Sequence, residues 1–396
     1  MTTVAITNIG QLITNSPELG DGSCSNSALG ELQNAALVAE NGKVVWVGSA
    51  TDLEATDECY SAEGRTVIPG FVDSHAHLMF AGDRAQEFAA RMSGEPYGAG
   101  GIRTTVAATR AATDAELETN LRRLAAEMLA SGITTFETKS GYGLDLSNEE
   151  RSLRIAAQVT PEVTYLGAHV VPAEYASDSN AYVELVAGDM LTAAAKHAKW
   201  IDVFCDRGAF NPEQATRILE AGKAAGLLPR LHANQLEAGK GIEVAVACEA
   251  ASADHCTHLS NNDIELLAGS NTVATLLPGA EFSTRAEYPN ARRLIDAGAT
   301  VALATDCNPG SSYTTSMPFC LAVAVRDMKF TPAEALWSAT AGGAKALRRN
   351  DVGHLGVGAS ADFVILNAPS HVHLSYRPGV NLIHQVWQHG RLVTAN

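Results

Sequence analysis

Two histidines spaced two apart, His75 and His77, follow an apolar stretch that is rich in strand-forming residues. Side chains alternate between the two faces of a strand, so both imidazoles point to the same side. Neutral imidazoles that meet at one point are good ligands for zinc or iron. A lone His-x-His pattern is common by chance, so its meaning depends on matching residues elsewhere in the chain.

Matching residues do follow other short apolar runs. His169, His232, His255 and Asp306 each stand at the end of such a run. If these runs are the parallel strands of one barrel, the side chains at their carboxyl ends converge at one mouth. Several imidazoles and a carboxylate gathered there predict a metal site.

The chemistry of each group indicates its role. We expect His75, His77 and His232 to be nitrogen ligands. Asp306 is expected to be an oxygen ligand that also takes a proton from the water that the metal activates. Three or four protein ligands leave a coordination position open for that water, and His255 is placed beside it as an acid, a base or an oxyanion stabiliser. We expect one divalent ion, Zn²⁺ or iron, because the run 201–205 carries no lysine that could bridge a second metal.

Strand-like and helix-like patterns alternate through the middle of the chain. Eight apolar runs are candidate strands: 67–73, 133–138, 164–168, 201–205, 228–231, 251–254, 273–277 and 301–304. Such alternation predicts an α/β fold with a parallel sheet, and eight repeats predict a (β/α)₈ TIM-like barrel over 69–346. Capping boxes that begin at Thr113 and Thr331 predict two helices, the first ending near residue 130.

The two ends of the chain have a different pattern, with short strands and tight turns. Asn41-Gly42 between two apolar runs predicts a hairpin, and similar short runs return after residue 347. Neither end is large enough to form its own core. We therefore expect 1–68 and 347–396 to combine into one small β-sandwich domain.

Composition excludes some classes of protein. The 396 residues are 46% hydrophobic and carry a net charge of −16, which disfavours binding to nucleic acid or to an anionic membrane. The first residues lack the pattern of a signal peptide, and seven cysteines without a C-x-x-C pair indicate reduced thiols. We expect a cytoplasmic protein that acts on a small molecule, and a homodimer.

The block 69–77 resembles the opening strand of the amidohydrolase superfamily. Further blocks occur in the same order, at 139–145, 167–172, 232–236, 252–255, 277–280 and 304–311. They are similar to the branch of that superfamily that acts in histidine degradation. The resemblance implies hydrolysis of the cyclic amide 4-imidazolone-5-propanoate to N-formimidoyl-L-glutamate by a metal-activated water.

The resemblance also implies substrate contacts. The carboxylate tail of the substrate would be clamped by Arg84, while Tyr142 and His169 would hold its ring and tail. Gln235 would take part in catalysis by hydrogen bonding a ring nitrogen. Three residues just past the metal aspartate would complete the substrate site: Asn308, Gly310 and Ser311.

The chain departs from the family at two places. Asn234 stands where the family commonly has an acid, and the glycine-rich loop 92–101 looks shortened, so Tyr97 is only a weak substrate-binding candidate. Asp73 is either a ligand or a support for one, and Glu137 is expected to pair with Lys139.

Three other functions compete with this hypothesis. A deaminase of the same superfamily would need a proton-shuttling glutamate at the position of Gln235, and an amide cannot shuttle protons. A formimidoyl-glutamate deiminase would be expected to lack the block 139–145. A catalytically inactive scaffold barrel would be expected to lose metal ligands, and all four are present.

Overall fold

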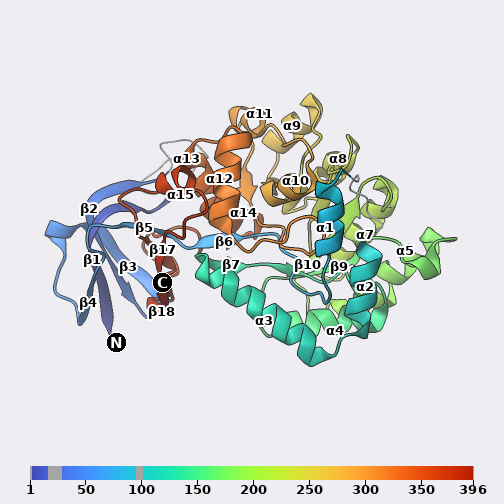
Figure 1. Cartoon of the computed structure of the whole chain (residues 1–396), viewed down its shortest axis with the longest axis horizontal. Coiled ribbons are helices and arrows are strands. Elements are labelled where there is room, and N and C mark those ends of the chain that lie inside the picture. Colours follow the sequence, from blue (N-terminus) through green and yellow to red (C-terminus); the bar gives the residue numbers. More distant parts are fainter. Residues whose placement is uncertain (1, 17–28, 95–100, 396) are drawn as a thin grey trace.

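The computed structural model describes residues 2–16, 29–94 and 101–395. Figure 1 shows strands from both ends of the chain gathered at one side, with the N- and C-termini close by, and helices arranged around the remaining strands. Tyr97 and most of the glycine-rich loop lie outside the described residues. Within those residues, no helix has both the length and the apolar composition needed to cross a membrane.

One eight-stranded sheet is built from both ends of the chain. Its strand order is β18-β17-β16-β5-β1-β2-β3, and β4 pairs with β1. The strands are β1 (Thr3–Ile13), β2 (Glu31–Glu40), β3 (Lys43–Ser49), β4 (Glu58–Ser61), β5 (Thr66–Pro69), β16 (Phe363–Leu366), β17 (Ile383–Gln388) and β18 (Arg391–Ala395). The predicted hairpin is confirmed, because β2 and β3 are antiparallel and both Asn41 and Gly42 have positive φ.

The middle of the chain forms parallel strands, which confirms the mixed α/β class. These are β6 (Phe71–Asp73), β7 (Ile133–Phe136), β8 (Thr138–Lys139), β9 (Val163–Ala168), β10 (Trp200–Cys205), β11 (Leu228–Pro229), β12 (Leu231–Ala233), β13 (Ser252–His255), β14 (Val273–Leu276) and β15 (Val301–Leu303). Strands β8 to β15 form one sheet, and β6 pairs with β7 in another. A parallel bridge between Ala76 and Cys307 joins the segments that follow β6 and β15.

Helices fill most of the gaps between these strands, and further helices follow β15. They are α1 (Ala85–Met92), α2 (Ile102–Ala111), α3 (Asp114–Ala130), α4 (Leu146–Ala156), α5 (Ser179–Ala187), α6 (Asp189–Ala194), α7 (Pro212–Ala224), α8 (Gly241–Ala247), α9 (Asn261–Ala268), α10 (Pro278–Thr284), α11 (Ala291–Asp296), α12 (Met317–Asp327), α13 (Pro332–Trp337), α14 (Gly343–Ala346) and α15 (His373–Tyr376). Both predicted capping boxes are present, at Thr113 before α3 and at Thr331 before α13.

The prediction of a single strand over 67–73 is wrong. Thr66–Pro69 pairs with β16 in the terminal sheet, whereas Phe71–Asp73 pairs with β7 among the parallel strands. Gly70 stands at the change of sheet, where a Cβ atom would lie 2.1 Å from the hydroxyl of Thr134. The apolar run thus crosses from one sheet to the other and brings His75 to the end of the parallel strands.

Candidate active site

The four predicted metal ligands form one cluster of imidazole nitrogens and a carboxylate oxygen. The Nε2 atoms of His75 and His77 are 3.2 Å apart, and the Nε2 atoms of His77 and His232 are 3.3 Å apart. Asp306 Oδ1 lies 3.5 Å from His75 Nε2 and 3.4 Å from His77 Nε2. Ligands about 2.0–2.1 Å from a tetrahedral zinc ion are separated by roughly 3.3–3.4 Å, so the cluster has the dimensions of a metal site.

Two of the imidazoles form hydrogen bonds through the ring nitrogen that points away from the cluster, and these bonds set their tautomers. His75 Nδ1 lies 2.8 Å from Asp254 Oδ2, and His232 Nδ1 lies 3.1 Å from Asp202 Oδ1. A carboxylate accepts, so each Nδ1 carries the proton and each Nε2 presents a lone pair to the cluster. Acceptors therefore face one another across the cluster, and a cation is the group that satisfies them.

Burial shapes the charges of the cluster. It lowers the pKa of His75, His77 and His255 well below the ordinary value for histidine, so these imidazoles are neutral. Burial also raises the pKa of Asp306 well above its usual range, an effect that a bound cation would oppose. The residues present thus fit a divalent metal in both geometry and donor type.

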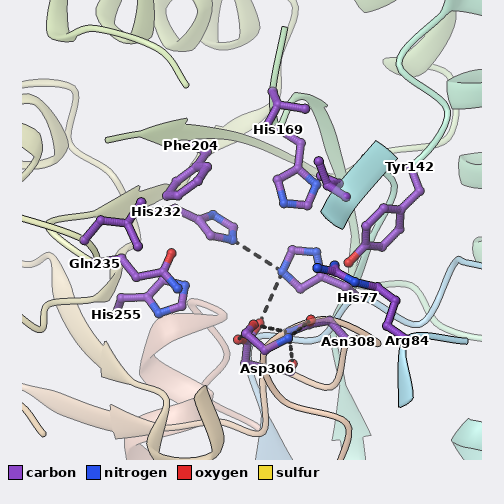
Figure 2. Close-up of a pocket in the computed structure, with 14 residues that line it drawn as sticks. His77, Arg84, Tyr142, His169, Phe204, His232, Gln235, His255, Asp306 and Asn308 are labelled. Carbon is purple, nitrogen blue, oxygen red and sulfur yellow. Dashed lines mark hydrogen bonds and ion pairs between the residues drawn. The ribbon is translucent and has the colours of Figure 1, made fainter. Parts of the chain in front are cut away.

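Figure 2 shows the pocket that opens above this cluster, with His77 at its centre. Its empty volume is about 580 Å³ including the mouth. Most of the predicted site residues line it: His77, Arg84, Tyr142, His169, His232, Gln235, His255, Asp306, Asn308 and Ser311. Sequence reasoning missed four apolar lining residues, namely Ile102, Val170, Phe204 and Leu236.

Arg84 reaches this pocket from the start of α1. Its Nε and Nη2 atoms donate to the carboxylate of Glu87, at 2.8 and 2.5 Å. Gly310 packs on its other side, since a Cβ atom there would lie 2.2 Å from Arg84 Nη1. Gly310 is absent from the lining of the main pocket and lines a neighbouring one with Arg84.

The turn after β15 holds Asp306, which has a positive φ of 51°. Asn308 donates to the carbonyl oxygen of Asp306 at 2.7 Å and accepts from the backbone N–H groups of Gly310 and Ser311 at 2.8 Å each. Ser311 Oγ donates to Asp306 Oδ2 at 3.3 Å. These contacts fix the strained aspartate with Oδ1 toward the histidines.

Tyr142 and His169 face the pocket from neighbouring loops. Their ring centroids are 5.4 Å apart, and His169 stacks on His77 at 5.4 Å. Burial lowers the pKa of His169 to about 3, so this imidazole is also neutral. Gln235 follows β12, and its backbone N–H donates to Asp206 Oδ2 at 2.7 Å while its side chain lines the pocket (Figure 2).

Asn234 and Asp73 support the site from behind. Asn234 Nδ2 donates to the carbonyl oxygen of His258 at 3.1 Å, a bond that an acid at this position could not donate. It thereby braces the chain after His255, which has a φ of 77°. Asp73 accepts hydrogen bonds from Thr305 and from the backbone N–H of His75, as expected of a support for the predicted ligands.

Known proteins share this fold and these sequence features. Residues 66–393 match the model of the amidohydrolase family, and the chain belongs to that family. Its relatives include the imidazolonepropionase of Streptomyces avermitilis, which is 64% identical over 98% of this chain and 96% of the relative. The imidazolonepropionase of Mycolicibacterium smegmatis is also 64% identical, over 99% of this chain and 98% of the relative.

Solved structures of lower identity show the same fold. The atrazine chlorohydrolase of Arthrobacter aurescens in complex with zinc has a TM-score of 0.73 at 16% identity, over 99% of this chain and 95% of that one. The guanine deaminase of Escherichia coli has a TM-score of 0.69 at 17% identity, over the whole of both chains.

Proposed function

We propose that this protein hydrolyses 4-imidazolone-5-propanoate to N-formimidoyl-L-glutamate, a step of histidine degradation. The observation that carries the proposal is the cluster of His75, His77, His232 and Asp306 beneath a pocket that also contains Arg84. The named activity of relatives at 64% identity over nearly the whole chain supports the same reaction.

His75, His77, His232 and Asp306 would hold one divalent metal, zinc or iron. When bound, such a metal lowers the pKa of a water and polarises a carbonyl group. A single ion is supported by the state of Lys139, a fully buried lysine beneath the cluster. Its Nζ lies 2.9 Å from Glu137 and 3.0 Å from Asp202, and two carboxylates at those distances favour an ammonium over a negatively charged carbamate.

The chain's own residues supply the proton transfers. Asp306 Oδ2 takes the proton of the attacking water and delivers it to the ring nitrogen that leaves. His255 is neutral and donates a hydrogen bond to the carbonyl oxygen as negative charge develops there. The amide of Gln235 hydrogen bonds a ring nitrogen and orients the ring, and it moves no proton.

The remaining pocket residues bind the substrate. Arg84 would clamp the carboxylate tail, and Tyr142 and His169 would hold the ring and tail. The turn that carries Asp306 would be fixed by hydrogen bonds from Asn308 and Ser311. The position of Arg84 would be fixed by its close packing against Gly310.

We also propose the finer architecture. The parallel strands would form a closed eight-stranded barrel over 69–346, supported by the Ala76–Cys307 bridge between its first and last segments. Residues 1–68 and 347–396 would form one β-sandwich domain, supported by their shared sheet. We expect the protein to be a cytoplasmic homodimer, and light scattering would test the dimer. The acidic charge of the chain supports the expectation that it binds neither nucleic acid nor an anionic membrane.

The decisive experiment mixes the metal-loaded protein with imidazolonepropanoate, generated in place from urocanate by urocanase. Mass spectrometry would follow N-formimidoyl-glutamate, with a chelator-treated sample as control. We expect product that disappears after chelation and returns when metal is restored. A metal-loaded protein that forms no product would exclude this substrate, and release of ammonia from an amino-heterocycle would then favour a deaminase.

A further inference from the structure

Charged side chains form a buried layer beneath the candidate metal cluster. Glu137, Lys139 and Asp202 are each fully buried, with no exposed surface. Burial of a charged group costs several kcal/mol unless partners compensate it. A lysine with two carboxylates at this depth therefore needs an explanation beyond the packing of the barrel.

Lys139 connects two strands through its ammonium group. Its Nζ lies 2.9 Å from Glu137 Oε1 and 3.0 Å from Asp202 Oδ2. The predicted pair with Glu137 is thus confirmed, and the second carboxylate is new. Burial acts to lower the pKa of Lys139, but Glu137 and Asp202 together raise it above the ordinary value, so the side chain is charged.

The first arm of this network holds the backbone between two ligands. Glu137 Oε2 accepts from the backbone N–H of Ala76 at 3.1 Å, and the backbone N–H of Lys139 donates to the carbonyl oxygen of Ala76 at 3.0 Å. Ala76 lies between His75 and His77. Both of its backbone groups are therefore bound by the segment that carries Lys139.

The second arm holds the ligand on β12. Asp202 Oδ1 lies 3.1 Å from His232 Nδ1 and accepts from the backbone N–H of His232 at 3.2 Å. Its other oxygen, Oδ2, is the one that faces Lys139. Asp202 thus joins the imidazole of His232 to the ammonium group.

We infer that Lys139 is a positioning residue that fixes the His75–His77 segment and His232 relative to each other, through Glu137 on one side and Asp202 on the other. This inference rests on the metal-site part of the proposed function.

The test replaces Lys139 by methionine, which has a similar length and no charge. Lys139→Met should weaken binding of Zn²⁺ by 10- to 100-fold in a chelator competition, the range found when residues behind metal ligands are changed. It should also alter the visible absorption of the Co²⁺-loaded protein, because that spectrum reports ligand geometry. Loss of packing alone would leave the spectrum of the bound Co²⁺ unchanged.

Lys199→Met is the matched control. Lys199 pairs with the buried Glu162 at 2.8 Å, and these residues stand just before β10 and β9, at the amino-terminal ends of those strands and away from the cluster. We expect this variant to keep the wild-type Zn²⁺ affinity and Co²⁺ spectrum. If Lys139→Met also kept both, the inference would be wrong. If the wild-type chain itself bound no metal, the proposed function would fail first.

A second variant covers the case in which Lys139→Met does not fold. Glu137→Gln removes the charge of one partner and leaves Lys139 and Asp202 in place. We expect it to fold, to bind Zn²⁺ more weakly than the wild type and to show a shifted Co²⁺ spectrum. A wild-type affinity and spectrum in this variant would overturn the inference independently.

Discussion

At the scale of single residues, Glu281 is a buried carboxyl group that the sequence did not single out. It lies in α10 and accepts a hydrogen bond from Thr257 Oγ1 at 2.9 Å. Burial raises its pKa from 4.5 to about 7. The folded chain therefore prefers the protonated acid, and this contribution to stability is present below pH 4.5 and lost as the pH rises to about 7.

Glu281→Gln removes this dependence while keeping an acceptor for Thr257. Relative to wild type, we expect the free energy of unfolding of the variant to rise by about 3 kcal/mol between pH 4 and pH 8. Urea denaturation at both pH values would measure it. Glu334→Gln is the control. Burial acts to raise the pKa of Glu334, but Arg292 keeps this pKa below its ordinary value. Relative to wild type, the free energy of unfolding of this variant should therefore fall, not rise, between the same two pH values. Parallel pH curves for Glu281→Gln and wild type would contradict the prediction.

The proposed ligands could be predicted from the sequence, but most of the residues that support them could not, and Asp73 is the exception. Sequence patterns predict this role for His75, His77 and His232, because several imidazoles at the ends of buried strands are seldom needed for packing alone. Asp202 and Asp254 were missed although each is a charged group inside an apolar run, which itself indicates a buried partner. Their partners come from other strands, and no local pattern shows which strands meet across the interior.

At the scale of elements, the first turn of α4 organises the loop that presents Tyr142. Glu149, which is fully buried, accepts hydrogen bonds from the backbone N–H groups of Gly141, Gly143 and Leu144. The carbonyl oxygen of Gly141 in turn lies 3.0 Å from His169 Nδ1. One carboxylate thus shapes the loop on which two proposed substrate contacts depend.

Glu149→Gln should therefore impair substrate binding without removing metal. Oε1 accepts from all three backbone N–H groups and Oε2 accepts from that of Gly141 alone. The amide keeps one acceptor oxygen, but it loses the negative charge and places an NH₂ donor against the Gly141 N–H. We expect KM to rise at least about 10-fold, equivalent to about 1.4 kcal/mol, with unchanged metal content. Steady-state kinetics would test this. Glu150→Gln, the next residue of α4, pairs with His197 away from the pocket and should leave KM unchanged.

Helix starts were predictable because capping boxes are local, as Thr113 and Thr331 show. The break between the two strands at Gly70 could not be predicted, because it depends on contact with Thr134, which is more than sixty residues away. An apolar run alone does not tell one sheet from the next.

At the scale of the whole molecule, the proposed ligands join distant parts of the chain. His75 and His77 follow β6, His232 lies in β12 and Asp306 follows β15. These segments are also joined directly, since the backbone N–H of Asp306 donates to the carbonyl oxygen of His75 at 2.9 Å. A cation held by all of them binds only the folded chain and must therefore stabilise it.

Removal of the metal should lower the melting temperature. A site saturated at 100 times its Kd contributes about 2.7 kcal/mol, so we expect a fall of several degrees on chelation and recovery when metal is restored. Scanning calorimetry with and without chelator would measure it. In His232→Ala the chelator should have little effect, because the site lacks one of its three imidazoles. A chelator effect of wild-type size in that variant would place the metal elsewhere. An equal melting temperature for the metal-loaded and metal-free wild type would contradict the prediction, because a cation that binds only the folded chain must stabilise it.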